Sequence, residues 1–212
     1  MIKHPFTIDD IPYDDKDGWS DVINRFNNEI IRSLYPILNN GLYHLTSKEN
    51  CIKIISDGFI RPNNDPDKVN YHCAKTNYGF LNKWICLFDF NASPIDIVNT
   101  CDSWMHFFVD HKITIIFQLN RRNLHKLIDF SYHQSLDKQD QRFCIHNVES
   151  WYPEPINISN ITNFIVVKCN RDPVNFTIFN HEDVQEFYYT HPEYTFPSHF
   201  EDFLELKIRD IL

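Results

Sequence analysis

The stretch that decides the fold is GLYHLTSKENCIKIISDGFI, residues 41–60. Near its start, residues 42–46 place Leu, His and Thr on one face of a strand, and Tyr and Leu on the other. Thr46, followed three residues later by Glu49, predicts a capping box at the start of a helix. The stretch therefore predicts a short strand that turns directly into a helix.

The predicted helix has an apolar side and a defined end. Ile52 and Ile55, with Ile54 beside them, have the spacing of a buried helix face. Gly58 occupies the position at which many helices end in a left-handed residue, and the apolar residues 59–60 then resume an extended path. We expect Ile52 and Ile55 to be buried.

His44 is the polar ring that this unit carries on its strand. A histidine among apolar strand neighbours is commonly a core residue whose ring is satisfied by backbone hydrogen bonds. The alternative is a functional ring, positioned just before a helix start. The surrounding sequence bears on this choice.

The phrase Tyr-His-Leu-Thr-x-x-x-Asn at residues 43–50, followed by a helix and Asp-Gly-Phe-Ile at residues 57–60, resembles the opening motif of the ADP-ribosyltransferase superfamily. The resemblance is greatest to the nucleic-acid-modifying DarT-like toxins and their poly(ADP-ribose) polymerase relatives. It implies that His44 and Thr46 fix the nicotinamide ribose of NAD. It also implies that the backbone at Leu45 or its neighbours pairs with the carboxamide.

Two further residues near this motif are candidate NAD contacts. Asn50 fits the DarT-like pattern. Arg61 begins a loop in which prolines and turn-forming residues interrupt regular structure. Its guanidinium either meets a pyrophosphate or is a solvated loop arginine. The arginine that usually contacts NAD in the DarT-like branch has no assigned counterpart here.

A second motif lies about a hundred residues further along the chain, within residues 142–158. Glu149 ends a strand-like segment before Trp-Tyr-Pro, which predicts a carboxylate held at a strand edge. The phrase Glu-x-Trp-x-Pro-x-x-Ile, residues 149–156, is similar to the third motif of the same superfamily. In that family the glutamate is the catalytic residue.

Glu149 suits the chemistry that the resemblance implies. Cleavage of the nicotinamide glycosidic bond develops positive charge on the ribose, which a fixed carboxylate stabilises while it orients or deprotonates the acceptor. No GxGxxG follows a predicted strand, which argues against a Rossmann hydride-transfer enzyme. We therefore expect NAD as a substrate, bound in a cleft between sheets.

The resemblance also calls for an aromatic ring that stacks on nicotinamide, and Tyr71 and Tyr78 are both candidates. The face of such a ring attracts a planar cation. A tyrosine before a strand is also commonly a packing residue, so both interpretations stay open. His72 and Cys73 are adjacent, and adjacent residues rarely share an ion, so we expect no metal site.

The net charge of −9 is concentrated at the two ends of the chain. Residues 1–21 carry six Asp against two Lys, a net charge of −4, and residues 182–212 carry eight acids against two bases, a net charge of −6. The middle of the chain is left with +1. Charge therefore does not exclude a nucleic-acid or nucleotide site there.

Cysteine usage and hydropathy bear on the compartment. The six Cys show no Cys-x-x-Cys pairing and no apolar signal segment begins the chain, which predicts reduced thiols in a cytoplasmic protein. Asp or Lys interrupts the most apolar stretches within about ten residues, so we expect no membrane span.

We expect one α+β domain over residues 1–212, because the length fits one large domain with a sizeable core. The resemblance implies an ADP-ribosyltransferase-like split β-sandwich of mixed short strands flanked by helices. The expected segments are an acidic lead-in at 1–18, an N-terminal helix at 19–38, the core at 41–169 and a C-terminal helical closure at 176–212.

The two motifs favour an NAD-dependent ADP-ribosyltransferase that transfers ADP-ribose to DNA, RNA or protein. The resemblance implies a toxin of a prokaryotic toxin–antitoxin or phage-defence system, for which an antitoxin is a candidate partner. The alternative is an acidic, non-enzymatic immunity or antitoxin-type protein that binds a basic partner through its charged ends. The enzyme requires His44 and Glu149 to point into one cleft, whereas the alternative predicts that they lie far apart or are occluded.

Overall fold

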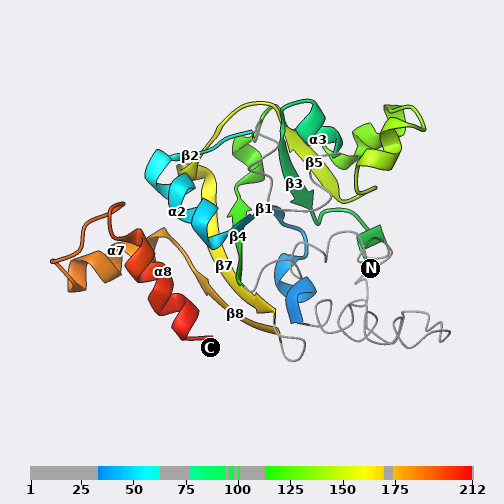
Figure 1. The fold of residues 1–212 in the computed structure, drawn as a ribbon. Helices are drawn as coiled ribbons and strands as arrows, with labels where there is room; N and C mark the ends of the chain where they lie inside the picture. Colours follow the sequence, from blue (N-terminus) through cyan, green and yellow to red (C-terminus); the bar gives the residue numbers. More distant parts are fainter. Residues whose placement is uncertain are drawn as a thin grey trace.

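The computed structural model describes most of the chain beyond residue 32 (Figure 1). The described residues are 33–62, 77–93, 96–97, 100, 113–169 and 174–211. The acidic lead-in expected at 1–18 and most of the helix expected at 19–38 lie outside these residues. The last part of that helix is described, and residues 33–38 are helical as expected.

Strands and helices follow one another along the chain without a fixed repeat. The described strands are β1 (Leu42–Ser47), β2 (Phe59–Ile60), β3 (Ile85–Asp89), β4 (Ile113–Leu119), β5 (Glu149–Tyr152), β6 (Ile156–Asn157), β7 (Ile161–Cys169) and β8 (Val174–Phe179). The described α-helices with named bounds are α2 (Lys48–Asp57), α3 (Tyr78–Leu81), α7 (His181–Thr190) and α8 (Phe200–Arg209). Short 3-10 helices are η4 (Arg121–Asn123), η5 (Phe130–Ser135), η6 (Asp140–Phe143) and η7 (Ile158–Asn160).

Six strands form one sheet in the order β5-β3-β1-β4-β7-β8, and β2 pairs separately with β6. All of these pairs are antiparallel. The expected α+β class is confirmed, whereas the ADP-ribosyltransferase-like split β-sandwich stays a prediction. The strand of His44, β1, lies inside the sheet, and the strand of Glu149, β5, lies at one end of the order (Figure 1).

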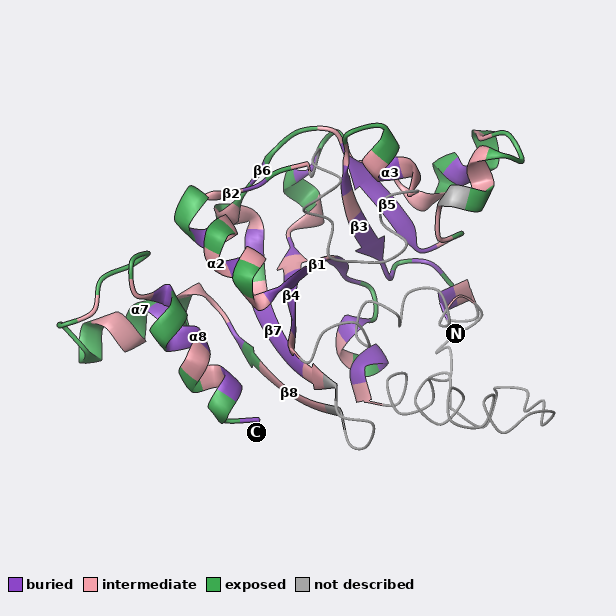
Figure 2. Ribbon diagram, viewed as in Figure 1, coloured by how far each residue is buried: buried purple, intermediate pink, exposed green. Residues whose placement is uncertain are grey.

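The central strands are buried on both faces, because successive side chains of a strand alternate between the two. On β4, Ile115 and Phe117 belong to one hydrophobic cluster and Ile116 to the other. On β7, Phe164 and Ile165 divide in the same way. We call the side of Phe117 face A and the side of Ile116 face B. Figure 2 shows buried residues on the central strands and along β5, whereas β8 at the other end of the sheet is mostly intermediate or exposed.

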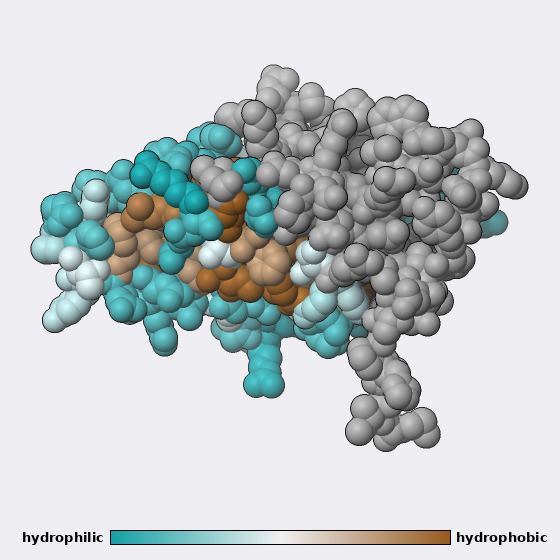
Figure 3. Space-filling model, turned by 90° about the horizontal axis from the view of Figure 1, so that it is seen from below, coloured by the Kyte–Doolittle hydropathy of each residue, from teal (hydrophilic) through white to brown (hydrophobic). Residues whose placement is uncertain are grey.

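Apolar residues also reach the surface. Seen from below, they form a band between hydrophilic margins (Figure 3). Ile178 of β8 is 44% exposed, and it lies opposite Ile165 of face B. None of the described helices has the length and apolar character needed to cross a membrane.

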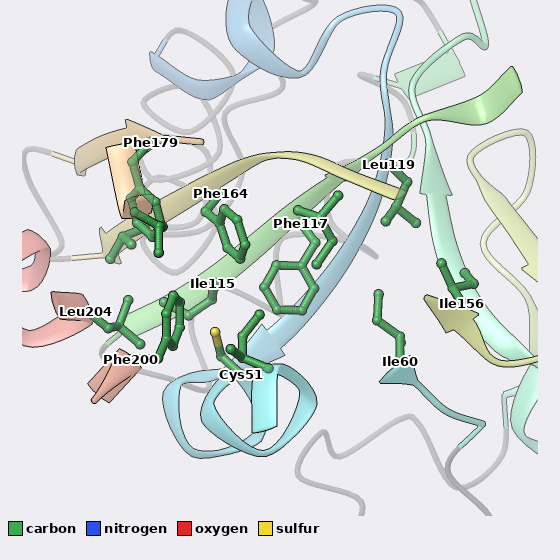
Figure 4. Close-up of a cluster of buried hydrophobic side chains, with 14 of the residues drawn as sticks. Cys51, Ile60, Ile115, Phe117, Leu119, Ile156, Phe164, Phe179, Phe200 and Leu204 are labelled. Atoms are coloured by element: carbon green, nitrogen blue, oxygen red, sulfur yellow. The ribbon is translucent and has the colours of Figure 1, made fainter. Parts of the chain in front are cut away.

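Face A carries the larger, aromatic core (Figure 4). The ring of Phe164 stacks on Phe179, with centroids 4.9 Å apart, and meets Phe117 edge-on at 5.4 Å. Buried residues of α2, α7 and α8 cover these rings, including Cys51 and Phe200. Aromatic pairs in these geometries contribute beyond the area that they bury.

The junction of β1 and α2 forms largely as the sequence predicts. Gly58 ends α2 with φ of 75°, a conformation that glycine adopts without strain. The cap itself differs, because Ser47 rather than Thr46 caps the helix, with its side chain accepting a hydrogen bond from the backbone of Asn50. The buried face also differs in part: Ile55 is buried as expected, whereas Ile52 is only half-buried.

The C-terminal helices close over face A. Asn180 caps α7 and forms a reciprocal capping box with Asp183, as expected from polar residues at these two positions. On the other side, Lys48 at the start of α2 pairs with Glu205 of α8 and lies 3.5 Å from Glu201. These ion pairs connect the helix after His44 to the last helix of the chain.

Candidate functional site

Glu149 is the first residue of β5 and is buried, with 2% of its surface exposed. Its Oε1 accepts hydrogen bonds from Asn77 Nδ2 at 2.6 Å and from Trp151 Nε1 at 2.8 Å. Its Oε2 accepts a hydrogen bond from the backbone N–H of Ile145 at 2.9 Å. Two donors near in sequence and one distant donor, Asn77, therefore fix the carboxylate, as expected for a residue held at a strand edge.

Asn77 links this carboxylate to the start of α3. Its Oδ1 caps the helix by accepting from the backbone N–H groups of Gly79 at 2.8 Å and Phe80 at 3.3 Å. The thiol of Cys86 on β3 donates to the same oxygen at 3.0 Å. With its oxygen occupied in this way, the side-chain amide of Asn77 is oriented to donate to Glu149.

The packing around the network requires a glycine at position 79. A Cβ on Gly79 would overlap Trp151 and would lie 2.6 Å from the sulfur of Cys86. Tyr78 is half-buried beside it, with its ring centroid 5.2 Å from that of Trp151. Of the two tyrosines expected near nicotinamide, Tyr78 thus lies next to the Glu149 network, and Tyr71 lies outside the described residues.

Opposing effects act on the charge of Glu149. Burial raises the pKa of the carboxyl group, because transfer from water disfavours the ionised form. The hydrogen bonds from Ile145, Asn77 and Trp151 lower the pKa, since they favour the carboxylate. Burial has the larger effect, and the pKa lies above its usual value.

His44 is half-buried on face A. Its Nδ1 lies 3.1 Å from the backbone carbonyl of Cys86, and its ring stacks on Phe117 with centroids 6.2 Å apart. Burial lowers the pKa of His44 to about 4, and the bond to Cys86 only partly opposes this shift. The imidazole is therefore neutral at physiological pH. With Nδ1 protonated, it donates to the carbonyl and leaves Nε2 as an acceptor.

His44 and Glu149 lie close in the sheet but on different faces. Tyr43 is opposite Phe88, and Phe88 is opposite Glu149, so these three side chains form a row on face B. His44 follows Tyr43 and therefore points to face A, where it meets Phe117. The backbones of Tyr43 and Glu149 are about 10 Å apart, two strand spacings. The expected convergence of both side chains in one cleft is not seen in this arrangement.

The other predicted NAD contacts surround β1 and α2. Leu45 and Thr46 are both buried. Asn50 is half-buried in the first turn of α2, and its backbone N–H donates to the cap residue. Arg61 is exposed after β2, with its guanidinium 5.1 Å from the centroid of the Phe59 ring. The structure therefore gathers His44, Leu45 and Thr46 on one strand and leaves Arg61 at the surface.

The residues that hold Glu149 were not predicted from the sequence. Asn77 had a usable signal, because Asn before a short apolar helix favours capping. Cys86 had none, since a thiol in an apolar strand looks like any core residue. A second polar group, formed by His133, Cys144 and His146, lies near this network and was also not predicted.

No protein-family model matches the chain, and no curated protein or solved structure matches it.

Proposed function

We propose that the protein is an NAD-dependent ADP-ribosyltransferase that transfers ADP-ribose to a nucleic-acid or protein acceptor. The observation that carries the proposal is the strand order β5-β3-β1. It brings two sequence motifs about a hundred residues apart onto strands that only β3 separates. Because the two motifs resemble those of DarT-like proteins, we also propose that the protein is a toxin of a prokaryotic toxin–antitoxin or defence system.

Glu149 is the catalytic residue in this proposal. Its carboxylate is already positioned by Asn77, Trp151 and Ile145, so little reorganisation is needed when positive charge develops on the ribose. The donors favour the ionised form that this role requires, and they oppose the larger effect of burial, which raises the pKa of the carboxyl group. A fixed charge in a dry environment acts more strongly than one in water.

The junction between β1 and β3 is the proposed place for the nicotinamide ribose. Pairing between the two strands ends at Tyr43, one residue before His44. There, the imidazole of His44 contacts the backbone carbonyl of Cys86. The thiol of the same residue donates a hydrogen bond to Asn77. Binding would exchange the Cys86 carbonyl for a ribose hydroxyl at His44. Because Glu149 is buried on the opposite face of the sheet from His44, the same step has to open access to it past the end of the β1–β3 pairing.

The leaving group has a candidate ring on the same side as Glu149. Tyr78 contacts Trp151, whose indole N–H donates to the carboxylate. A ring at this position could stack on nicotinamide while the glycosidic bond breaks. Tyr71 remains the second candidate from the sequence.

The proposal is tested by incubating the protein with labelled NAD and separate pools of DNA, RNA and protein. Glu149→Gln should retain NAD binding and lose transfer by about 10²- to 10³-fold, the loss typical of a principal electrostatic residue. His44→Ala should lose both binding and transfer. Glu154→Gln is the matched control, because this exposed residue pairs with Lys126 outside the network, and its transfer rate should equal that of the parent.

Two results would refute the assignment. Transfer by Glu149→Gln at the parental rate would remove Glu149 as the catalytic residue. A parent that neither binds NAD nor releases nicotinamide would remove the enzyme altogether. Circular dichroism should first establish that each variant is folded, because the amide of Gln at position 149 presents an N–H to the backbone donor of Ile145.

A second function is favoured by the burial of Glu149 and by its position on the opposite face of the sheet from His44. Both of its oxygens accept hydrogen bonds from the protein, an arrangement that is also typical of a purely structural carboxylate. Exposed acids lie on the C-terminal helices, among them Glu182, Glu186 and Glu201. A non-enzymatic protein that binds a basic partner would use this charge. Salt-sensitive binding to a basic protein, without NAD turnover, would support it.

A further inference from the structure

His133 is a buried histidine without ordinary hydrogen bonds. It lies in the last turn of η5, 2% exposed, and packs on Trp151 with ring centroids 4.8 Å apart. Within the described residues, neither of its ring nitrogens has a hydrogen-bond partner of ordinary geometry. A buried polar group without a hydrogen-bond partner lowers the stability of the fold. A bound ion at the ring nitrogens would remove this cost.

Two other ligand types meet His133. One ligand atom from each of His133, Cys144 and His146 lies within 4.8 Å of the other two. Cys144 has an extended backbone, with φ of −136° and ψ of 157°, and His146 follows two residues later. His146 lies in the turn after Ile145, and its ring meets the buried ring of His133 edge-on, with centroids 5.9 Å apart.

We propose that His133, Cys144 and His146 bind a divalent transition metal ion, of which Zn²⁺ is the best match. Imidazole nitrogen and thiolate sulfur are the ligands that zinc prefers. Around a tetrahedral ion, bonds of about 2.0 Å to nitrogen and about 2.3 Å to sulfur place ligand atoms about 3.3–3.6 Å apart. The cluster, within 4.8 Å, needs only small side-chain movements to reach that spacing.

The site has a closed side and an open side. His133 is buried, Cys144 is half-buried and His146 is exposed, so an ion can enter beside His146. Three protein ligands leave a fourth position on a tetrahedral ion for water or another small ligand. The assigned ligand class is therefore a single zinc-like ion with one open coordination position.

The surrounding loop is already ordered around this site. Asp129 caps η5 through the backbone N–H of Ser131, and Gln141 donates to the carbonyls of His133 and Leu136, each at 3.1 Å. Ile145, between the two exposed-side ligands, donates its N–H to Glu149. A metal ion would therefore tie together the loop that supplies one of the Glu149 donors. Metal binding itself does not depend on whether Glu149 is catalytic.

The test is a metal titration of the full chain. The protein is purified with a non-thiol reductant, freed of metal with a chelator and titrated anaerobically with Co²⁺ and then with Zn²⁺. The parent should bind one Co²⁺ per chain with tetrahedral d–d bands and a thiolate-to-cobalt charge-transfer band. One equivalent of Zn²⁺ should remove both signals. Zn²⁺ should also raise the melting temperature of the parent.

Variants at the accessible ligands avoid disturbing the buried ring. Cys144→Ser should abolish the charge-transfer band and the Zn²⁺-dependent rise in melting temperature. His146→Ala should weaken binding at least tenfold, since losses of outer-shell partners alone cost about 10- to 100-fold. His125→Ala, an exposed histidine outside the cluster, should behave as the parent. The proposal is overturned if the parent shows no charge-transfer band, or if Cys144→Ser retains the parental band and affinity.

Discussion

The two ends of the sheet differ in the side chains that they bury. At the β7–β8 end, buried rings such as Phe164, Phe179 and Phe203 pack against one another. At the β5–β3 end, the carboxylates of Glu149 and Asp89 are buried within the sheet. Asp89 pairs with Arg121, and Glu149 accepts three hydrogen bonds. The β7–β8 end buries aromatic and aliphatic side chains, whereas the β5–β3 end buries charged groups with their partners among apolar residues such as Leu87 and Trp151.

The two kinds of buried group differ in what they contribute to stability. Burial of rings stabilises a fold directly, whereas a buried carboxylate has to recover its desolvation cost through hydrogen bonds and ion pairs. A hydrophobic replacement of similar shape often does as well for stability. Concentration of such groups at one end of the sheet, next to both sequence motifs, is what the proposed function requires of its site.

The largest expected effect lies at the aromatic end. Phe164→Ala should lower the free energy of unfolding by about 3–5 kcal/mol, because the cavity would lie among Phe117, Phe179 and Phe200. Urea denaturation would measure it. Ile178→Ala, at the same end but 44% exposed, is the control and should lose much less. Equal losses for both would mean that this end is not the stabilising core described here.

A second prediction concerns the helix between the two ends. Ile55→Ala should cost about 2–5 kcal/mol by leaving a cavity under α2. Ile52→Ala should cost less, because Ile52 is only half-buried while Ile55 is buried. Thermal melts of both variants would rank them. Equally large losses for both variants would mean that Ile52 is buried as fully as Ile55, which is what the sequence alone predicts.

Local features of the fold were predictable from sequence. The strand of residues 42–47, the left-handed Gly58 and the Asn180 cap all depend on neighbours within a few residues. The cap of α2 was misplaced by one residue, because Thr46 and Ser47 are adjacent and both can cap. Which one does so is decided by the turn of the chain out of β1.

The long-range arrangement could not be predicted in the same way. The sequence motifs single out His44 and Glu149. Which face of the sheet each side chain occupies depends on the register of β1, β3 and β5, which pairs residues far apart in sequence. The partners Asn77 and Cys86 reach Glu149 only through that register. The cluster of His133 with Cys144 likewise arises from the folding of a loop that has no strong periodicity.

The third prediction tests the boundary strand between the two ends through pH. The pKa of His44 is 6.5 unfolded and about 4 in the folded protein, so between these values the unfolded chain binds a proton that the folded chain does not. The contribution to stability is complete above pH 6.5 and is lost as pH falls toward 4, by up to about 3 kcal/mol. His44→Asn should lack this loss. Denaturant titrations of both proteins at pH 7, 6 and 5 would reveal it, because the other acid-sensitive groups cancel in the difference.

The smallest expected effect is at Ser47, where β1 passes into α2. Ser47→Ala removes the oxygen that accepts from the backbone of Asn50 and should cost about 1 kcal/mol. Thr46→Val, which removes the neighbouring hydroxyl, should leave the cap intact. Hydrogen exchange of the Asn50 amide would distinguish them, with faster exchange expected in Ser47→Ala alone. Faster exchange in Thr46→Val instead would return the cap to Thr46.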